Sequence, residues 1–207
     1  LCGIGIPAAA MQSLSSVMTL ELNKIMALFD PSAVFILGAY FKLQSFLIMP
    51  VAGLTNGLTP LVAYNYGARS RTRILALTRF ALALGAAIMA VGTILLIFLP
   101  GPLLGLFGAE ENVLSSGIPA LRWIAFGLIF SGLSTVLCAV FQALGASMTS
   151  LAISLLRQVV LILPAAYLLG LVQPQLMWLS FPLAEVLSCL TALFLFRHSW
   201  RKRLSDL

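Results

Sequence analysis

Long apolar runs separated by short polar stretches fill the chain. A helix needs about twenty apolar residues to cross the roughly 30 Å hydrocarbon core of a bilayer. Runs bounded by glycine, proline or charge reach that length at about residues 5–29, 33–61, 76–99, 118–142, 148–170 and 177–197. The pattern therefore predicts an all-α integral membrane protein with six transmembrane helices.

The six runs differ in how apolar they are. The third and fourth each contain a single charge near one end, Arg79 and Arg122. Polar side chains dilute the first run, so a soluble helix is the alternative interpretation there. Between the third and fourth runs, the apolar residues around Leu104 and Phe107 indicate either a short interfacial helix or an ordinary connector.

Composition supports a membrane location. Hydrophobic residues make up 61% of the 207 residues and charged residues 9%, with a mean hydropathy of +1.08. These values exclude a water-soluble globule. Twelve basic residues against six acidic ones give a net charge of +6, which in a soluble chain would suggest a nucleic-acid partner. In a membrane protein, the distribution of charge between the loops is more informative than the sum.

Basic residues gather on one side of the predicted membrane. If the six spans alternate in direction, the loop after the second span and the segment after the sixth lie on the same side. Eight of the twelve basic residues flank that side: Arg69, Arg71, Arg73, Arg79, Arg197, Arg201, Lys202 and Arg203. The positive-inside rule then places both ends of the chain in the cytoplasm. We expect a multi-pass protein of the cell membrane, with membrane lipids as partners and no nucleic acid.

Few residues suit metal binding or covalent catalysis. Cys2, Cys138 and Cys189 lie far apart in apolar surroundings, and His198 is the only histidine. This spacing fits neither a metal site nor a disulfide framework. No Ser/His, paired-Asp, HExxH or glycine-rich phosphate motif lies within a run. We therefore expect no cofactor, no metal and no enzymatic activity.

Polar side chains within the first span form a stripe. Gln12, Ser16, Thr19 and Asn23 follow one another at intervals that place them on one face of a helix. Such a stripe either lines a cleft or supports helix packing. Similar stripes recur in the fourth and fifth spans, at Ser131, Thr135, Cys138 and Gln142, and at Ser150, Ser154 and Arg157.

Several charged residues lie within the predicted spans, and the cost of burying each one raises the question of its partner. Glu21 has two available cations, Lys24 three residues later and Lys42 at a similar depth in the second span. A structural ion pair and a role in transport both remain open for Glu21. Arg157 and Glu185 fall near the middle of the bilayer, where a lone charge is costly. They predict either a salt bridge between helices or an ion-binding polar cavity.

Prolines interrupt three of the spans, at Pro50, Pro60, Pro164 and Pro182. Each removes a backbone hydrogen bond and permits a kink. Broken helices near the membrane midplane are common in secondary transporters, although kinks without function also occur. These four prolines are hinge candidates.

Motifs along most of the chain resemble those of one family. They comprise Gly5-Ile6-Pro7, residues 42–69 (KLQSFLIMPVAGLTNGLTPLVAYNYGAR), residues 141–145 (FQALG), Leu156-Arg157-Gln158 followed by Pro164, and residues 181–185 (FPLAE). These stretches resemble the multidrug and toxic compound extrusion (MATE) family, in its bacterial branch of small-drug exporters.

The resemblance implies a fold and a function. Family members have twelve spans in two six-helix lobes with the drug cleft between them, and residues 1–207 resemble the C-terminal lobe. The N-terminal lobe of the same chain is then missing, and we expect the 207 residues to be inactive alone. The implied function is antiport, in which organic compounds, often cationic or amphipathic, are exported in exchange for sodium ions or protons.

Specific residues become candidates through this resemblance. Glu21 and Glu185 are candidates for coupling to the sodium ion or proton. The candidates for the substrate cleft are polar residues of four spans: Gln12, Ser16, Asn23, Lys42, Gln44, Gln142, Arg157 and Gln158.

Three other functions remain as alternatives. A flippase for a lipid-linked oligosaccharide has a similar many-helix form, but its pyrophosphate would be expected to need more cations than Lys42 and Arg157. An intramembrane enzyme lacks a recognisable motif. The polar stripes and prolines argue against a non-transporting scaffold.

Overall fold

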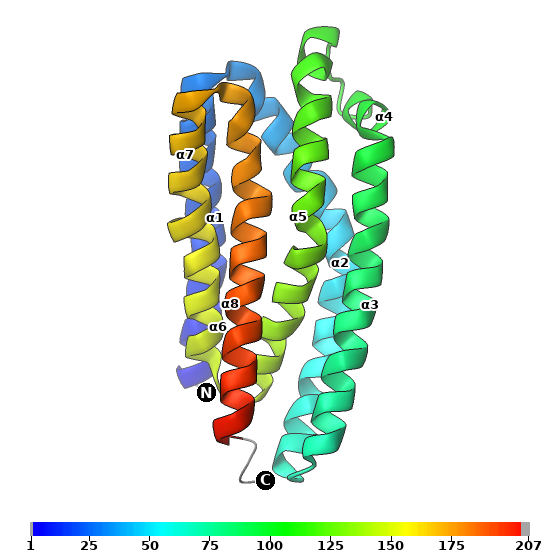
Figure 1. Ribbon diagram of the computed structural model, residues 1–207, viewed down its shortest axis with the longest axis vertical. Helices are drawn as coiled ribbons and strands as arrows, with labels where there is room; N and C mark the ends of the chain where they lie inside the picture. Colours follow the sequence, from blue (N-terminus) through cyan, green and yellow to red (C-terminus); the bar gives the residue numbers. More distant parts are fainter. Residues whose placement is uncertain (1, 204–207) are drawn as a thin grey trace.

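The computed structural model describes the backbone of residues 2–203 and the side chains of residues 9–11 and 13–198. Across this part of the chain all regular secondary structure is helical. The long helices stand side by side in an elongated bundle (Figure 1). The predicted all-α architecture is confirmed.

The described residues form six rods. Four rods are single helices: α1 (Cys2–Phe29), α2 (Pro31–Gly67), α3 (Arg71–Phe98) and α5 (Glu111–Ala143). The fifth rod changes type twice, through α6 (Ser147–Leu155), the π-helix η1 (Leu156–Ile162) and α7 (Leu163–Val172). The sixth consists of the 3-10 helix η2 (Pro174–Leu179) and α8 (Ser180–Arg203). A short helix, α4 (Pro100–Gly105), lies between α3 and α5, where the sequence indicated a short helix or a connector.

Length and composition suit the rods to a bilayer. Within the described residues, five stretches are long and apolar enough to cross a membrane: Pro31–Gly67, Arg71–Phe98, Glu111–Ala143, Ser147–Val172 and Pro174–His198. Helix α1, whose sequence is the most diluted by polar residues, is 28 residues long and packs beside α6 and α7. Helix α1 begins and α8 ends at the same end of the bundle, as an even number of rods requires (Figure 1).

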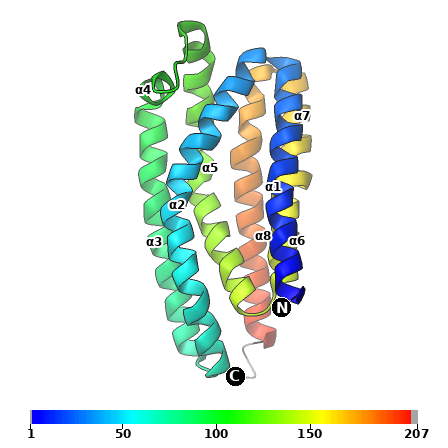
Figure 2. The same cartoon turned by 180° about the vertical axis from the view of Figure 1, so that it is seen from behind.

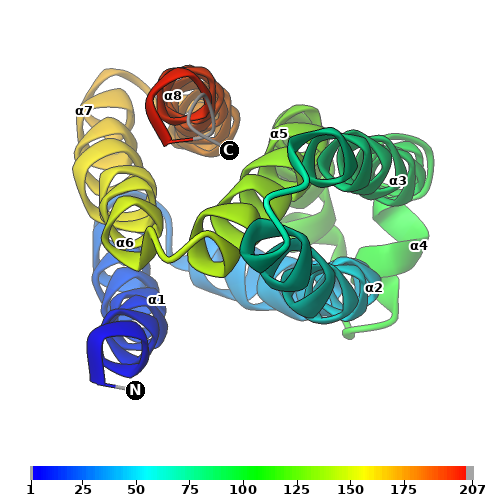
Figure 3. The same ribbon diagram turned by 90° about the horizontal axis from the view of Figure 1, so that it is seen from below.

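Helix α5 is at the centre of the bundle. It packs against α2, α3 and α8, and 61% of its apolar stretch is buried, against 22–39% in the other four candidate spans. Helices α1 and α2 meet at their connecting turn and diverge toward the other end (Figure 2). Viewed along the bundle, α1, α6 and α7 lie on one side of α5, and α2, α3 and α4 on the other (Figure 3). This divergence leaves room for polar side chains between α1 and α2.

The turn between α1 and α2 is fixed by a capping interaction. Asp30 is the N-cap of α2, and its Oδ1 accepts hydrogen bonds from the Ser32 backbone N–H at 2.9 Å and the Ser32 hydroxyl at 2.7 Å. Pro31 follows at the first helical position, where its missing N–H leaves no bond unmade. The local sequence therefore sets where α1 ends and α2 begins.

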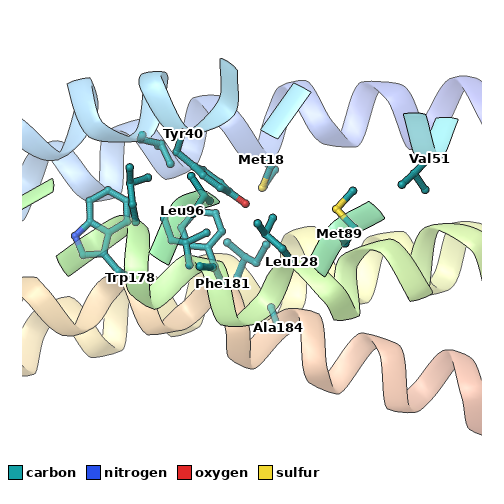
Figure 4. Packing of buried hydrophobic residues seen from close by; sticks show 14 of the residues in the cluster. Met18, Tyr40, Val51, Met89, Leu96, Leu128, Trp178, Phe181 and Ala184 are labelled. Carbon is teal, nitrogen blue, oxygen red and sulfur yellow. The ribbon is translucent and has the colours of Figure 1, made fainter. Parts of the chain in front are cut away.

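Aromatic residues fill the core toward the α1–α2 turn (Figure 4). Tyr40 of α2 is buried and meets Phe181 of α8 edge to face, with ring centroids 5.3 Å apart. Phe181 in turn stacks with Trp178 of η2 at 6.4 Å. Such pairs add to the stabilisation from buried area alone. They join α2 to the sixth rod beside the charged residues described below.

Gly127 lets α5 approach α8 closely. A Cβ atom placed on Gly127 would lie 3.0 Å from the Cα of Pro182 and 3.3 Å from its N. Both are backbone atoms, so no side-chain rotation relieves the contact. At Gly53 on α2, by contrast, an added Cβ would meet nothing within 4 Å.

We expect Gly127→Ala to destabilise the bundle by about 1–3 kcal/mol, because α5 and α8 must separate to admit the methyl group. Gly53→Ala is the matched control and should be neutral or slightly stabilising, since alanine favours a helix over glycine. Unfolding in detergent micelles, followed by circular dichroism, measures both. Equal midpoints for the two variants would contradict the close contact between α5 and α8.

Candidate functional site

Polar side chains line two adjoining cavities at mid-length of the bundle. The first, of about 310 Å³, lies between α1, α2, η1 and α8, and the second, of about 270 Å³, lies between α1, α2, α5, α6 and η1. Ser15, Arg157 and Gln158 line both. We call the two cavities together the central groove.

An ion pair lies in the central groove. Nη1 of Arg157, on η1, lies 3.3 Å from Oε2 and 3.5 Å from Oε1 of Glu185 on α8. The same nitrogen lies 3.5 Å from the Ser131 hydroxyl of α5. The side chains are 21% exposed for Arg157 and 9% for Glu185, so little solvent screens the pair. The structure thus joins the two deep charges that the sequence placed at similar depths.

The lengths of these contacts indicate a loose pair. Close bonds between a guanidinium and a carboxylate are about 2.7–2.9 Å long, shorter than the 3.3 and 3.5 Å found here. Removing one partner from a buried pair nevertheless costs about 3–5 kcal/mol, because the other charge is left uncompensated. The pair is therefore needed for the stability of the buried charges, and its long contacts leave the Glu185 carboxylate open to competition from another cation.

The cationic partner, Arg157, lies where the fifth rod changes from an α-helix to a π-helix. Arg157 and Gln158 are the second and third residues of η1. A π-turn contains more residues than an α-turn and shifts the direction of the side chains that follow, and such turns are frequent at functional sites. This π-helix is not predictable from the sequence, because its apolar pattern matches that of an ordinary span.

Gln158 brings an unpaired polar atom to the groove. The residue is 6% exposed, and its Oε1 has no hydrogen-bond partner among the described residues. Leaving a buried acceptor unpaired is unfavourable, so such atoms are normally satisfied by water or a ligand. The groove therefore has an acceptor available to a bound molecule or ion.

Five of the predicted site residues meet in the central groove. They are Gln44, Gln142, Arg157, Gln158 and Glu185. The Gln142 amide donates a hydrogen bond to the Ser150 hydroxyl at 3.1 Å, which holds α5 against α6. The polar stripes pointed to Gln142 and Arg157, the depth of its charge pointed to Glu185, and the family resemblance added Gln44 and Gln158.

Of the predicted stripe on α1, Thr19 faces the groove, whereas Ser16 and Asn23 do not line it. Ser16 is exposed, Asn23 lines neither cavity, and the side chain of Gln12 lies outside the described residues. The row that faces the groove is instead Met11, Ser15 and Thr19. Adjacent positions on a helix point about 100° apart, so an offset of one residue turns the row away.

Glu21 and Lys42 also lie away from the groove. Glu21 Oε1 pairs with Lys24 Nζ at 2.7 Å, and both side chains are largely exposed, at 45% and 70%. Lys42 is exposed on α2, where it lines a separate hollow with Phe35 and Phe107, and forms no ion pair with any described residue. Of the two partners considered for Glu21, the structure selects Lys24.

The four hinge candidates occupy two kinds of position. Pro50 and Pro60 lie inside α2 as predicted. Pro164 lies just after the π-helix gives way to α7, and Pro182 in the first turn of α8 after η2. Pro182 therefore does not break α8, since its missing N–H falls where a helix needs none. The hinge role of all four remains a prediction.

Several groove residues were missed from the sequence. Tyr40 lines neither cavity but packs against Phe181, which lines the first one, and its hydroxyl points toward mid-bundle in Figure 4. Thr55 and Thr59 of α2 line the second cavity. The spacing of the two threonines, four residues apart, was the available signal. Nothing in the sequence distinguishes Tyr40 from an aromatic core residue.

Membrane-length rods around a charged interior groove define the class of protein as a polytopic helical membrane protein. Residues 7–168 match the family model MatE, which is more than half of the chain. The chain therefore belongs to the MATE family. The resemblance noted in the sequence is confirmed.

Known proteins resemble the chain over part of their length. The FAD transporter of Shewanella oneidensis is 30% identical over 179 residues, which cover 81% of this chain and 37% of that protein. The multidrug export protein MepA of Staphylococcus aureus is 27% identical over 200 residues, covering 93% and 42%. A crystal structure of MATE in complex with MaL6 matches with a TM-score of 0.91 at 18% identity, covering 100% of this chain and 47% of that one. The chain thus spans less than half the length of these proteins.

We expect a double-mutant cycle on Arg157→Gln and Glu185→Gln to give a coupling energy of about 1–3 kcal/mol, because each single variant leaves a buried charge unpaired. The exposed pair Glu21 and Lys24 is the control, and its coupling should stay below about 0.5 kcal/mol. Unfolding in detergent measures both cycles. Equal coupling in the two pairs would contradict the burial of the Arg157–Glu185 pair.

Proposed function

We propose that this chain forms one lobe of a secondary active antiporter that exports organic compounds, often cationic or amphipathic, in exchange for sodium ions or protons. The loosely paired Glu185 in the central groove is the observation that supports this function most. Its carboxylate has a single cationic partner among the described residues, at distances that another cation can compete for.

The exchange follows from competition at Glu185. A sodium ion or proton on the carboxylate neutralises it and releases the Arg157 guanidinium, which then relies on Ser131 and on any bound acceptor. Binding of the ion and binding of the drug thus favour different arrangements of the groove. Antiport requires such a difference in affinity between two states. Glu21, already paired with Lys24 at the surface, is the weaker coupling candidate.

We further propose that a second lobe, the N-terminal lobe of the same chain, covers the exposed face of α2. Lys42 lies on that face, within an apolar stretch, and an ammonium group facing lipid at such a depth is costly. If the ammonium group of Lys42 instead faces a polar cleft between two lobes, this cost is removed. The lobe would then be C-terminal, with Lys42 in the substrate cleft and the basic end, at Arg69, Arg71 and Arg73, in the cytoplasm.

We expect Glu185→Gln, in the full-length transporter, to reduce ion-driven dye export at least about tenfold, because the neutral amide no longer binds the coupling ion. Export is measured in cells with sodium present or removed, and with the proton gradient intact or collapsed. Glu185→Asp retains the carboxylate and should retain part of the ion dependence. Glu21→Gln is the control expected to export normally.

Membrane insertion of each variant is checked by quantitative blotting. Unchanged, ion-dependent export by a well-inserted Glu185→Gln variant would exclude this carboxylate as the coupling site. Residues 1–207 expressed alone should give no export, since one lobe has no closed cleft. Drug resistance from residues 1–207 alone would refute the need for a second lobe.

A second candidate function is carriage of an anionic, phosphate-bearing compound, as in the flippase alternative. The unpaired Lys42 favours it, and the FAD transporter of Shewanella oneidensis is among the relatives. If the substrate is anionic, Lys42→Gln should reduce its export several-fold and leave the export of a cationic dye unchanged. Lys24→Gln is the matched control for loss of a lysine. Absence of transport of flavin nucleotides and of lipid-linked pyrophosphates by the full-length protein would exclude this candidate, and their unchanged transport in Lys42→Gln would exclude a role for Lys42.

A further inference from the structure

A separate pocket lies at the α1–α2 end of the bundle, opposite the ends of the chain. It has a volume of about 320 Å³ and lies between the α1–α2 turn, α5 and the turn from α7 into η2. None of its lining residues lines the central groove. We call it the aromatic pocket. Any ligand here would be bound independently of Glu185.

Fixed aromatic rings form the walls of this pocket. Trp123 of α5, Trp178 of η2 and Phe29 at the end of α1 all line it. Each ring is held by another ring outside the pocket: Trp123 by Phe126 at 6.4 Å, Trp178 by Phe181 at 6.4 Å and Phe29 by Tyr167 at 6.0 Å. Trp178 is only 3% exposed, so its ring is already ordered and binding a ligand against it costs little side-chain entropy, whereas Trp123 is 41% exposed.

The pocket also contains one carboxylate with a free oxygen. Both hydrogen bonds from Ser32 go to Oδ1 of Asp30, and no hydrogen bond of the described residues reaches Oδ2. No lysine, arginine or histidine lines the pocket. The nearby Arg122 donates its Nε–H to the Ile97 carbonyl at 3.2 Å, toward α3 and outside the pocket. The pocket therefore carries an unneutralised negative charge.

A carboxylate among tryptophan and phenylalanine rings has a distinctive chemistry. The faces of aromatic rings attract cations, and cages of such rings recognise quaternary ammonium groups. An inorganic cation would instead require several oxygen ligands, whereas Asp30 is the only acidic residue that lines this pocket. A bulky organic cation with a diffuse charge fits both features.

We propose that the aromatic pocket binds a trimethylalkylammonium group. The side-chain amide of Gln175, also in the lining, offers a donor and an acceptor to a polar substituent on the ligand, whereas the Ser116 hydroxyl donates to the Val113 carbonyl at 3.3 Å. The group can belong to free choline or to the choline headgroup of a lipid. This site does not rest on the proposed antiport function, because binding here requires no movement of the lobe.

The test is equilibrium binding of radiolabelled choline to the purified transporter in maltoside micelles. We expect saturable binding that is displaced by excess unlabelled choline and not by 3,3-dimethylbutan-1-ol, which has the same shape without the charge. Quenching of tryptophan fluorescence gives a second readout, since two of the three tryptophans of this chain line the pocket. Equal displacement by the neutral analogue would overturn the proposal.

Variants localise the binding. Asp30→Asn removes the charge but keeps an oxygen that caps α2, so the turn is preserved and choline affinity should fall at least about tenfold. Trp123→Leu should weaken binding about two- to fivefold through loss of a cation–aromatic contact. Glu110→Gln, near the start of α5 and outside the pocket lining, is the matched control and should bind normally. Full choline binding in Asp30→Asn would overturn the assignment.

Competition identifies the source of the group. Short-chain phosphocholine lipid that displaces choline more effectively than choline itself would assign the site to a lipid headgroup. Displacement of the label by choline and not by the phosphocholine lipid would assign the site to a free cation. A phosphoglycerol lipid, which lacks the choline group, should not displace bound choline. Absence of binding by both choline and phosphocholine lipid would refute the proposal, whatever the transport assays show.

Discussion

The burial of one positive and one negative charge at mid-length of the bundle is the constraint on which the interior depends. Arg157 and Glu185 come from different rods, so η1 and α8 must lie in register for either charge to be tolerated. The close contact of Gly127 with Pro182 brings α5 to the same level, where Ser131 reaches the guanidinium. Packing and charge therefore locate the same three rods relative to one another.

The sequence predicted the architecture well because hydropathy is a local property. Each predicted span lies within one helical rod to within one residue, and the apolar cluster around Leu104 does form a short helix. The depth of Arg157 and Glu185 could likewise be counted from the ends of their spans. Contacts between rods are not local, and only the structure shows that these two charges meet.

Helix rotation was the part least accessible from the sequence. The buried face of α1 is set by Met18, Leu22 and Met26, which pack into the core. The resulting rotation of α1 about its axis brings Ser15 to the groove and leaves Ser16 outside it. A polar stripe shows that a helix has two faces but not which neighbour each face meets. The π-helix has no signature in the apolar pattern, which continues through residues 156–162 as in an ordinary span.

The π-helical segment allows a charge to be re-aimed without displacing whole rods. It is seven residues long and lies between α6 and α7, which are both regular. Rewinding one π-turn into an α-turn changes the residue count by one, which rotates the adjoining side chains by about 100°. Arg157 lies within the segment itself, so the winding of this segment sets the direction of its guanidinium relative to Glu185.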